Sequence, residues 1–256
     1  MHGSRSARAL SLVTLVLVTL TAACGGDPAT SSASSSTTST IETGTADFCS
    51  AAGKLVAAIG SGAGDPSEAL KTAINTAPKP LAKDLSTLGE KFGKAASSGD
   101  ERAFLANDLR EIANTTFAGI ASACAYQIID FSAVEYKFDG IPAVVNAGLT
   151  AFHMTDLGSE VHEMLLYRRA KGTEGNIVDI VNDDPTVSDG RLEAVSVMFP
   201  AAHGEESRLL VDLTSGDYVA VCFFPKGTMS MAQVGGQDRT GPDHRSLGMI
   251  TPFAVK

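Results

Sequence analysis

The sequence predicts an α+β multidomain protein in which a small helical bundle precedes an all-β Greek-key sandwich. Two patterns carry this prediction. Residues 46–128 place apolar side chains at the spacing of amphipathic helices. Residues 129–256 contain short apolar or alternating runs separated by turn residues, which is typical of the strands of a sandwich. The chain has 256 residues, of which 44% are hydrophobic, so it can form one or two soluble domains.

Residues 1–23 have the pattern of a targeting segment. Two arginines precede the apolar run Ala9–Ala23, which is shorter than the ~20 residues that a membrane-spanning helix needs. Small residues stand just before Cys24, and this arrangement resembles the lipobox of bacterial lipoproteins, with Thr21 at the usual leucine position. The resemblance implies that Cys24 becomes a lipidated first residue and anchors the chain to the extracytoplasmic face of the cell membrane. An ordinary secretory signal cut after Ala23 is the alternative.

Residues 24–45 form a linker after the anchor cysteine. From Asp27 onward the segment is almost entirely Ser, Thr, Ala and Gly. It has too little apolar surface to offset the entropy of ordering it. We expect a flexible spacer between the membrane and the folded body.

Helix-start and periodicity signals divide the bundle into three or four helices. Asp65 is placed as an N-cap, with Pro66 at the first helical position and Glu68 in the first turn. A second apolar stripe repeats at helical spacing through Leu81, Leu85, Leu88 and Phe92. The polar side chains of the bundle form no recognisable site, and their charges are expected to lie on solvated faces.

The chain has four cysteines, and three are outside the lipid-anchor position. Cys49 lies in the first expected helix and Cys124 near the end of the last. Outside the cytoplasm these two are expected to form a disulfide. Cys222 is then left unpaired. It is either coordinated to a metal or buried as a small apolar side chain, and both interpretations stay open.

The β region is expected to contain seven or so short strands. The run Val134–Phe138 alternates as a half-buried strand should, and the run Arg208–Leu213 is strongly apolar. Further strands are expected over residues 144–148, 150–155, 164–168, 176–181, 191–197, 218–224 and 250–255. His162 begins one strand, Cys222 ends another and Met249 precedes the last, so these three points can converge at one rim.

Three soft-ligand side chains stand in the last part of the chain. Cys222 ends a strand, and His244 is followed by Met249 five residues later. A fourth candidate, His162, follows the turn Asp156-Leu157-Gly158-Ser159-Glu160. Thiolate, imidazole and thioether together are the donor set that copper prefers. Taken singly, each residue has an ordinary structural explanation, as a loop histidine or core filler.

In these features residues 134–256 resemble a cupredoxin, the blue-copper fold of plastocyanin, amicyanin and azurin. The resemblance implies a type-1 copper set of His162, Cys222, His244 and Met249, with the histidines equatorial and Met249 axial. Cupredoxins usually carry electrons, so it also implies a redox protein partner. The family normally places only a few residues between the cysteine and the second histidine, whereas 21 residues, Phe223–Asp243, separate them here.

Other functions compete with copper electron transfer. Met229 and Met231 place two thioethers on one side of an extended segment, a pattern that suits Cu(I) carriage. A metal-free cupredoxin-like module that binds a protein or small molecule at the cell surface is the main alternative. His153 and His203 are assigned no role. We expect no enzymatic activity, because a multicopper oxidase or nitrite reductase needs further histidine clusters and only five histidines exist. A net charge of −9 argues against a nucleic-acid partner.

Overall fold

The computed structural model describes residues 37–61, 64–183, 189–234 and 241–256. The expected signal segment, the lipidation site Cys24 and most of the expected linker lie outside these residues. Within the described ranges, no helix is both long enough and apolar enough to cross a membrane. The first helix begins at Thr37, inside the segment expected to be linker.

The helical part of the chain contains four α-helices: α1 (Thr37–Ser61), α2 (Pro66–Thr76), α3 (Lys79–Ser98) and α4 (Asn107–Ala123). The predicted start of α2 is confirmed, because the Asp65 side chain accepts a hydrogen bond of 2.8 Å from the Ser67 N–H. The α3 helix ends at Gly99, which has φ of 70° and so adopts the left-handed conformation that glycine tolerates best. The apolar stripe of α3 is buried as its spacing predicts.

Two β-sheets follow the helices. The four-stranded sheet has the order β2-β1-β4-β7, and the five-stranded sheet has the order β3-β9-β8-β5-β6. Their strands are β1 (Gln127–Val134), β2 (Lys137–Asp139), β3 (Val144–Val145), β4 (Gly148–Asp156), β5 (Leu165–Arg169), β6 (Leu192–Val197), β7 (Glu206–Leu213), β8 (Gly216–Val221) and β9 (Ile250–Val255). The β1–β4 and β3–β9 pairs are parallel and the other pairs are antiparallel. This order confirms a helical part followed by β-sheets but does not establish the predicted Greek-key path.

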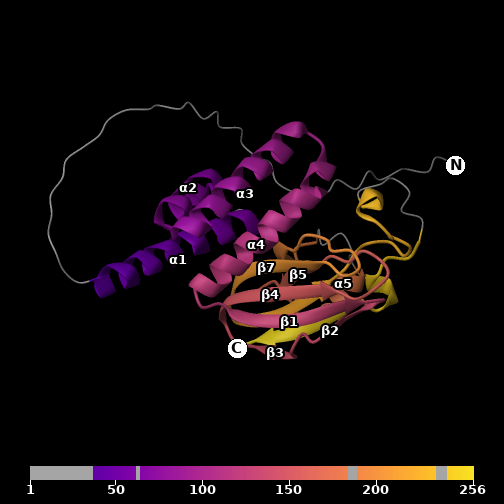
Figure 1. The fold of residues 1–256 in the computed structure, drawn as a ribbon. Coiled ribbons are helices and arrows are strands. Elements are labelled where there is room, and N and C mark those ends of the chain that lie inside the picture. The colour runs from indigo at the N-terminus through magenta and orange to yellow at the C-terminus, as the bar shows by residue number, and fades with distance from the viewer. Residues whose placement is uncertain (1–36, 62–63, 184–188, 235–240) are drawn as a thin grey trace.

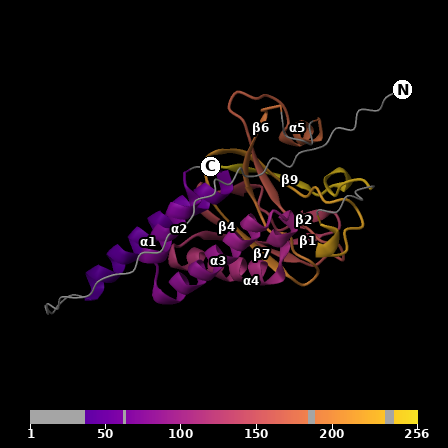
Figure 2. The ribbon, with the colours of Figure 1, turned by 90° about the horizontal axis from the view of Figure 1, so that it is seen from above.

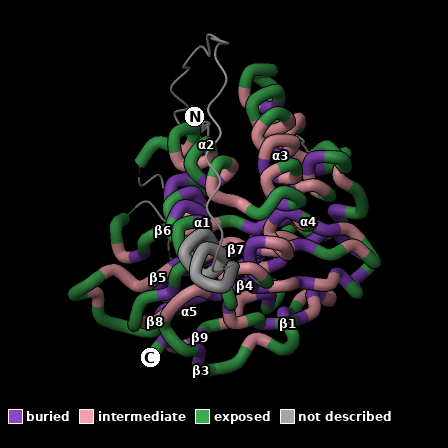
Figure 3. The backbone as a smooth tube through the Cα atoms, turned by 60° about the vertical axis from the view of Figure 1, so that its left-hand side comes forward, coloured by how far each residue is buried: buried purple, intermediate pink, exposed green. Residues whose placement is uncertain are grey.

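Helices α1–α4 cover one face of the four-stranded sheet, so the chain is built in layers (Figures 1 and 2). The main core lies between the two sheets and includes Phe152, Leu209 and Phe253. A second core joins α1 and α4 to the sheet through Ala151 and Leu210. Figure 3 shows the buried backbone concentrated where these layers meet. The helices and the sandwich therefore share a core.

Strands β4 and β7 are buried on both faces because of this layering. Successive side chains of a strand point to opposite faces. Phe152 and Leu209 face the other sheet, while their neighbours Ala151 and Leu210 face the helices. This is why three consecutive apolar residues, Leu209, Leu210 and Val211, stand in the middle of β7, where an alternating strand would have a polar residue.

Residues 176–181 were expected to be a strand, and this prediction was wrong. The segment forms the short helix α5 (Ile177–Asp183), whose Asn176 side chain accepts a hydrogen bond of 2.8 Å from the Val178 N–H. Ile177, Ile180 and Val181 repeat at helical spacing and pack on the outer face of the five-stranded sheet beside Val219. In so short an apolar run, helical and strand periodicity cannot be told apart.

Two strand boundaries also differ from the prediction. The run Val134–Phe138 was expected to be one strand, but it spans the end of β1, the two connecting residues Glu135 and Tyr136, and the start of β2. The cysteine strand was expected over 218–224, whereas β8 spans Gly216–Val221. Cys222 therefore lies directly after the strand, where its side chain can approach the connecting loops.

The expected disulfide is confirmed. Cys49 on α1 and Cys124 at the end of α4 are bonded, across a sequence separation of 75 residues. Cys222 is a free, buried cysteine. The disulfide thus joins the first and last helices of the bundle where both meet the sheet.

A partly buried ion pair links α4 to the sandwich. The Arg110 guanidinium donates to both carboxylate oxygens of Glu205 and also to the Pro200 carbonyl oxygen at 3.2 Å. Burial alone would raise the pKa of Glu205, but the bonds from Arg110 and from the Ala202 N–H hold it below its ordinary value of 4.5. A carboxyl whose pKa is lowered by folding stabilises the fold above its unfolded pKa, and this stabilisation is lost as the pH falls through the folded pKa.

The Glu205→Gln variant is expected to lower the free energy of unfolding at pH 7 by roughly 1–3 kcal/mol, because a charged hydrogen-bonded partner of Arg110 is removed. The difference from wild type should shrink as the pH falls below about 4.5, where the wild-type carboxyl also loses its charge. Urea unfolding at a series of pH values measures both effects. The exposed Glu174→Gln variant is the control, and a difference that stays constant with pH would contradict the ion-pair interpretation.

Candidate metal centre

Register in the five-stranded sheet brings three of the four predicted ligands to one end of the sandwich. Leu165 at the start of β5 pairs with Val221 at the end of β8, and Val221 pairs with Ile250 at the start of β9. Cys222 follows Val221 directly, and Met249 precedes Ile250. His162 stands three residues before β5, in an isolated antiparallel bridge with Ala201. His162, Cys222 and Met249 therefore lie at the same rim.

The long segment between Cys222 and His244 closes on itself at its base. The Pro225 and Asp243 backbones form an antiparallel bridge. The His244 N–H donates to the Phe224 carbonyl at 2.8 Å, and the Arg245 N–H donates to the Cys222 carbonyl at 2.9 Å. The two ends of the 21-residue insertion therefore lie side by side at the rim, and this places His244 next to Cys222.

All four side chains are fully buried, with no exposed surface. Cys222 Sγ lies 3.4 Å from Nδ1 of His244. The rings of His162 and His244 have centroids 5.0 Å apart. Met249 belongs to the same core cluster as Cys222, and its N–H donates to the His244 carbonyl at 2.9 Å. The structure therefore gathers the predicted residues in one buried region.

His162 has one bonded ring nitrogen and one bare ring nitrogen. Its Nδ1 lies 3.1 Å from a carboxylate oxygen of Asp156, and both residues are fully buried. A carboxylate only accepts hydrogen bonds, so Nδ1 carries the proton and Nε2 carries a lone pair. Nε2 is buried and has no hydrogen-bond partner within the part of the chain that the structure describes. Such orphaned buried atoms are uncommon and call for a physical explanation.

Glu160 and Tyr136 cover the outer edge of His244. Glu160 Oε2 lies 2.9 Å from Nε2 of His244, and the Tyr136 ring packs on the imidazole with centroids 4.9 Å apart. The Tyr136 hydroxyl donates to Glu160 Oε1 at 3.0 Å. Burial and this bond to Glu160 raise the pKa of Tyr136 to about 12. The tyrosine therefore stays protonated and remains a donor.

The Cys222 thiol and the His244 imidazole are both uncharged at neutral pH. Burial raises the pKa of the Cys222 thiol well above its usual range. Burial also lowers the pKa of His244, and the hydrogen bond that its Nε2–H donates to Glu160 opposes this effect only partly. Metal ligation requires the thiolate, so a cation that binds here must displace the Cys222 proton.

The chain Cys222–His244–Glu160 also has the order of a nucleophile, a base and an orienting acid. Cys222, however, is completely buried, and its raised pKa keeps it as the thiol. A nucleophilic cysteine needs access to substrate and thiolate character. This geometry is therefore unsuited to attack on a substrate.

Within the described residues, no three His, Cys, Asp or Glu side chains are placed closely enough to hold a metal ion. The four predicted ligands lie in one region, but their positions do not form a complete coordination site. The thioether pair expected to suit Cu(I) does not lie together either. Met229 is 55% exposed, whereas Met231 packs against the main core.

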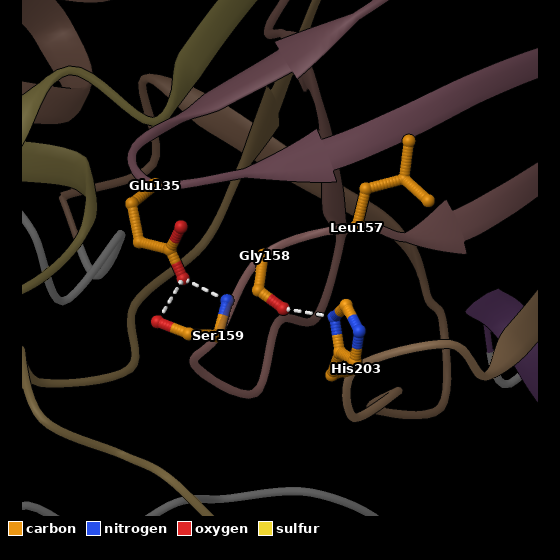
Figure 4. Close-up of a pocket in the computed structure, with 5 residues that line it drawn as sticks. All are labelled: Glu135, Leu157, Gly158, Ser159 and His203. Atoms are coloured by element: carbon orange, nitrogen blue, oxygen red, sulfur yellow. Dashed lines mark hydrogen bonds between the residues drawn. The ribbon is translucent and has the colours of Figure 1, made fainter.

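An open depression of about 470 Å³ lies beside the rim and is lined by Glu135, Leu157, Gly158, Ser159 and His203 (Figure 4). The Glu135 carboxylate accepts from the N–H and hydroxyl of Ser159, and His203 Nδ1 lies 2.7 Å from the Gly158 carbonyl oxygen. His203, to which the sequence assigned no role, is exposed despite this contact. The Gly158 backbone separates the depression from the His162 ring.

Gly158 leaves no room for a side chain. A Cβ there would lie 2.6 Å from His162 Cε1 and 2.7 Å from Glu135 Oε1. The Gly158→Ala variant is expected to displace the His162 ring and to lower the free energy of unfolding by ~1–3 kcal/mol, because both neighbours are held by hydrogen bonds. Chemical denaturation measures the loss.

Gly93→Ala is the matched control for this substitution. Gly93 lies on an exposed part of α3, and no atom of another described segment comes within 4 Å of the position that an alanine Cβ would take. Alanine there should stabilise the helix by up to ~1 kcal/mol. Equal stability of the Gly158→Ala variant and wild type would show that the His162 ring is not confined as described.

Sequence reasoning did not single out Asp156, Glu160 or Tyr136 as parts of this site. Asp156 and Glu160 stand in the turn that precedes His162. Their closeness in sequence to a candidate ligand could have marked them as parts of the site. Tyr136 comes from the β1–β2 connection, and no sequence pattern marked it as part of the site. His153 lies on the face of the four-stranded sheet that packs toward the helices, with Nδ1 2.7 Å from Asp130, away from the four predicted ligands.

No known family model matches the chain, and no curated protein matches it. Among solved structures, the chain is similar to an auracyanin from the photosynthetic bacterium Roseiflexus castenholzii, with 14% identity and a TM-score of 0.33 over 51% of this chain and 97% of that one. It is similar to auracyanin A, a blue copper protein of Chloroflexus aurantiacus, with 16% identity and a TM-score of 0.31 over 50% and 98% of the two chains. It is also similar to a multicopper oxidase of Campylobacter jejuni, with 10% identity and a TM-score of 0.29 over 51% of this chain and 30% of that one. These likenesses fall on about half of the chain and are too weak to assign it to a family.

Proposed function

We propose that this protein is a lipid-anchored, extracytoplasmic cupredoxin-like protein that binds copper for one-electron transfer. His162, Cys222, His244 and Met249 would hold the metal. A site of two imidazoles, one thiolate and a weak thioether is the donor set of blue-copper centres. Copper, when bound, would supply the Cu(II)/Cu(I) couple.

One observation carries the proposal: the bare, buried Nε2 of His162 beside the Cys222–His244 pair. This nitrogen has no hydrogen-bond partner among the described residues, its ring lies next to that of His244, and Nδ1 of His244 faces the thiol at 3.4 Å. A metal ion there would accept lone pairs from both nitrogens and the thiolate. It would give the orphaned nitrogen a partner that no described protein group provides.

The remaining parts of the proposal follow from the N-terminal sequence. Lipidation at Cys24 would hold the folded body at the outer face of the membrane, and the segment before α1 would act as a spacer. A redox protein would deliver or collect the electron. We propose no catalytic turnover for this chain.

A Cu(II) titration of the chain that lacks residues 1–24 tests the metal site, because every described helix and strand is retained. The expected result is one equivalent of bound copper with an intense blue thiolate charge-transfer band and a narrow copper hyperfine splitting in the EPR spectrum. Copper bound without colour would indicate imidazole or thioether ligation and would favour copper handling over electron transfer. Absence of both binding and colour would exclude the copper function.

A metal-free binding module is the second candidate. It is favoured by the open ligand set among the described residues. The metal-free interpretation predicts that Cu(II) leaves the thermal unfolding midpoint unchanged. The copper site predicts a midpoint that rises with copper concentration, because a ligand that binds only the folded state stabilises it.

A further inference from the structure

We propose that Glu160 is a positioning residue that orients His244 and presents its Nδ1 lone pair to the Cys222 side of the site. The role of Glu160 in metal binding rests on the proposed copper site. Its role in orienting His244 is a property of the metal-free protein. Glu160 is not among the side chains that would touch the metal, and it acts through His244.

The tautomer of His244 follows from its two neighbours. Nε2 lies 2.9 Å from Glu160 Oε2, and an ionised carboxylate can only accept a hydrogen bond. Nε2 must therefore carry the proton. Nδ1 lies 3.4 Å from Cys222 Sγ, whose S–H can donate to an unprotonated ring nitrogen. In this tautomer Nδ1 carries the lone pair and faces Cys222.

Glu160 is itself held by two other segments of the chain. The Gly227 N–H donates to Oε2 at 2.6 Å, and the Tyr136 hydroxyl donates to Oε1 at 3.0 Å. Gly227 belongs to the insertion between Cys222 and His244, and Tyr136 belongs to the β1–β2 connection. Together with Nε2–H of His244, these donors direct three hydrogen bonds at the Glu160 carboxylate, and a carboxylate can accept all of them. A fixed anion at this point fixes the imidazole plane.

The same contacts close the outer edge of His244. The His244 side chain has no exposed surface, and that of Glu160 is 9% exposed. Partners of this kind set the tautomer and orientation of a ligating imidazole and increase its basicity. Glu160 thus stands between His244 and solvent, and the insertion that separates the two ligands in sequence supplies one of its supports.

The first test needs no metal. Histidine labelled with nitrogen-15 is incorporated into the metal-free chain that lacks residues 1–24, and long-range proton–nitrogen NMR correlations report the tautomer of His244. Wild type is expected to show the Nε2–H tautomer. The Glu160→Gln variant should keep it, because the amide oxygen still accepts, whereas Glu160→Ala should show a mixture of tautomers.

The second test uses Cu(II). Loss of such a partner typically weakens metal binding by roughly 10- to 100-fold, and this is expected for Glu160→Ala. Glu160→Gln should restore part of the affinity, because it keeps the orientation but removes the charge. Glu174→Gln, a change at an exposed acid, is the control and should bind copper as wild type does.

The outcomes separate this inference from the copper proposal. A wild-type Nδ1–H tautomer would overturn the inference directly, even where Glu160→Ala does not fold. Copper binding of wild-type strength in Glu160→Ala would overturn it while leaving the copper site standing. The expected tautomers without any copper binding would support Glu160 as the positioning residue and exclude the proposed function.

Discussion

Replacing Cys222 by serine is expected to abolish the blue charge-transfer band of the copper-loaded protein completely. The band arises only when a thiolate binds Cu(II), and Cys222 is the free cysteine of the described residues. Serine keeps nearly the same volume, so the main core around this position should survive. Visible absorption and EPR of the copper-loaded variant measure the loss.

Two comparisons make the Cys222→Ser result specific. The unfolding transition of the metal-free variant shows whether the fold is retained. The His203→Ala variant removes an imidazole that lies in the neighbouring depression but not in the ligand set, and it should keep the full colour. Retained colour in Cys222→Ser would remove Cys222 from the site, and loss of colour in His203→Ala would place the metal elsewhere.

Removing the disulfide is expected to have the largest effect on stability. The double variant Cys49→Ser/Cys124→Ser releases a constraint across 75 residues of the unfolded chain. In the chain-entropy description, a loop of this length corresponds to ~4 kcal/mol of stability. Because the disulfide joins α1 and α4 where they pack on the sheet, the whole helical layer should unfold more easily. Denaturant unfolding of the two proteins gives the difference.

Reduction provides the matched control for the disulfide. A thiol reductant should lower the stability of wild type to about that of the double variant and leave the double variant unchanged. Cys222 is buried and unpaired, so it does not contribute to this response. Equal stability of wild type with and without reductant would contradict the expected role of the Cys49–Cys124 bond.

Local patterns predicted the elements that depend on near neighbours in the chain. The start of α2 needed only Asp65 and Pro66, because capping is decided within one turn. The apolar stripe of α3 was recognisable for the same reason. The disulfide pairing required only a count of cysteines and an expected oxidising compartment.

Predictions were wrong where tertiary contacts override weak local preferences. The segment Ile177–Asp183 could satisfy either periodicity, and its helix is selected because three apolar side chains fit against the outer face of the five-stranded sheet. The β1–β2 connection alternates like a strand, yet its Tyr136 turns toward His244. Short runs carry too little information to decide between such outcomes.

The sequence by itself determined the order of helices before strands, the disulfide partners and the soft donor types at His162, Cys222, His244 and Met249. Only the tertiary structure decided how the insertion returns His244 to Cys222 and which groups surround the imidazoles. Glu160 and His244 are 84 residues apart in sequence, so no local pattern can pair them. Their contact exists because a buried imidazole and a buried carboxylate each need a hydrogen-bond partner, and packing at the rim places the two groups side by side.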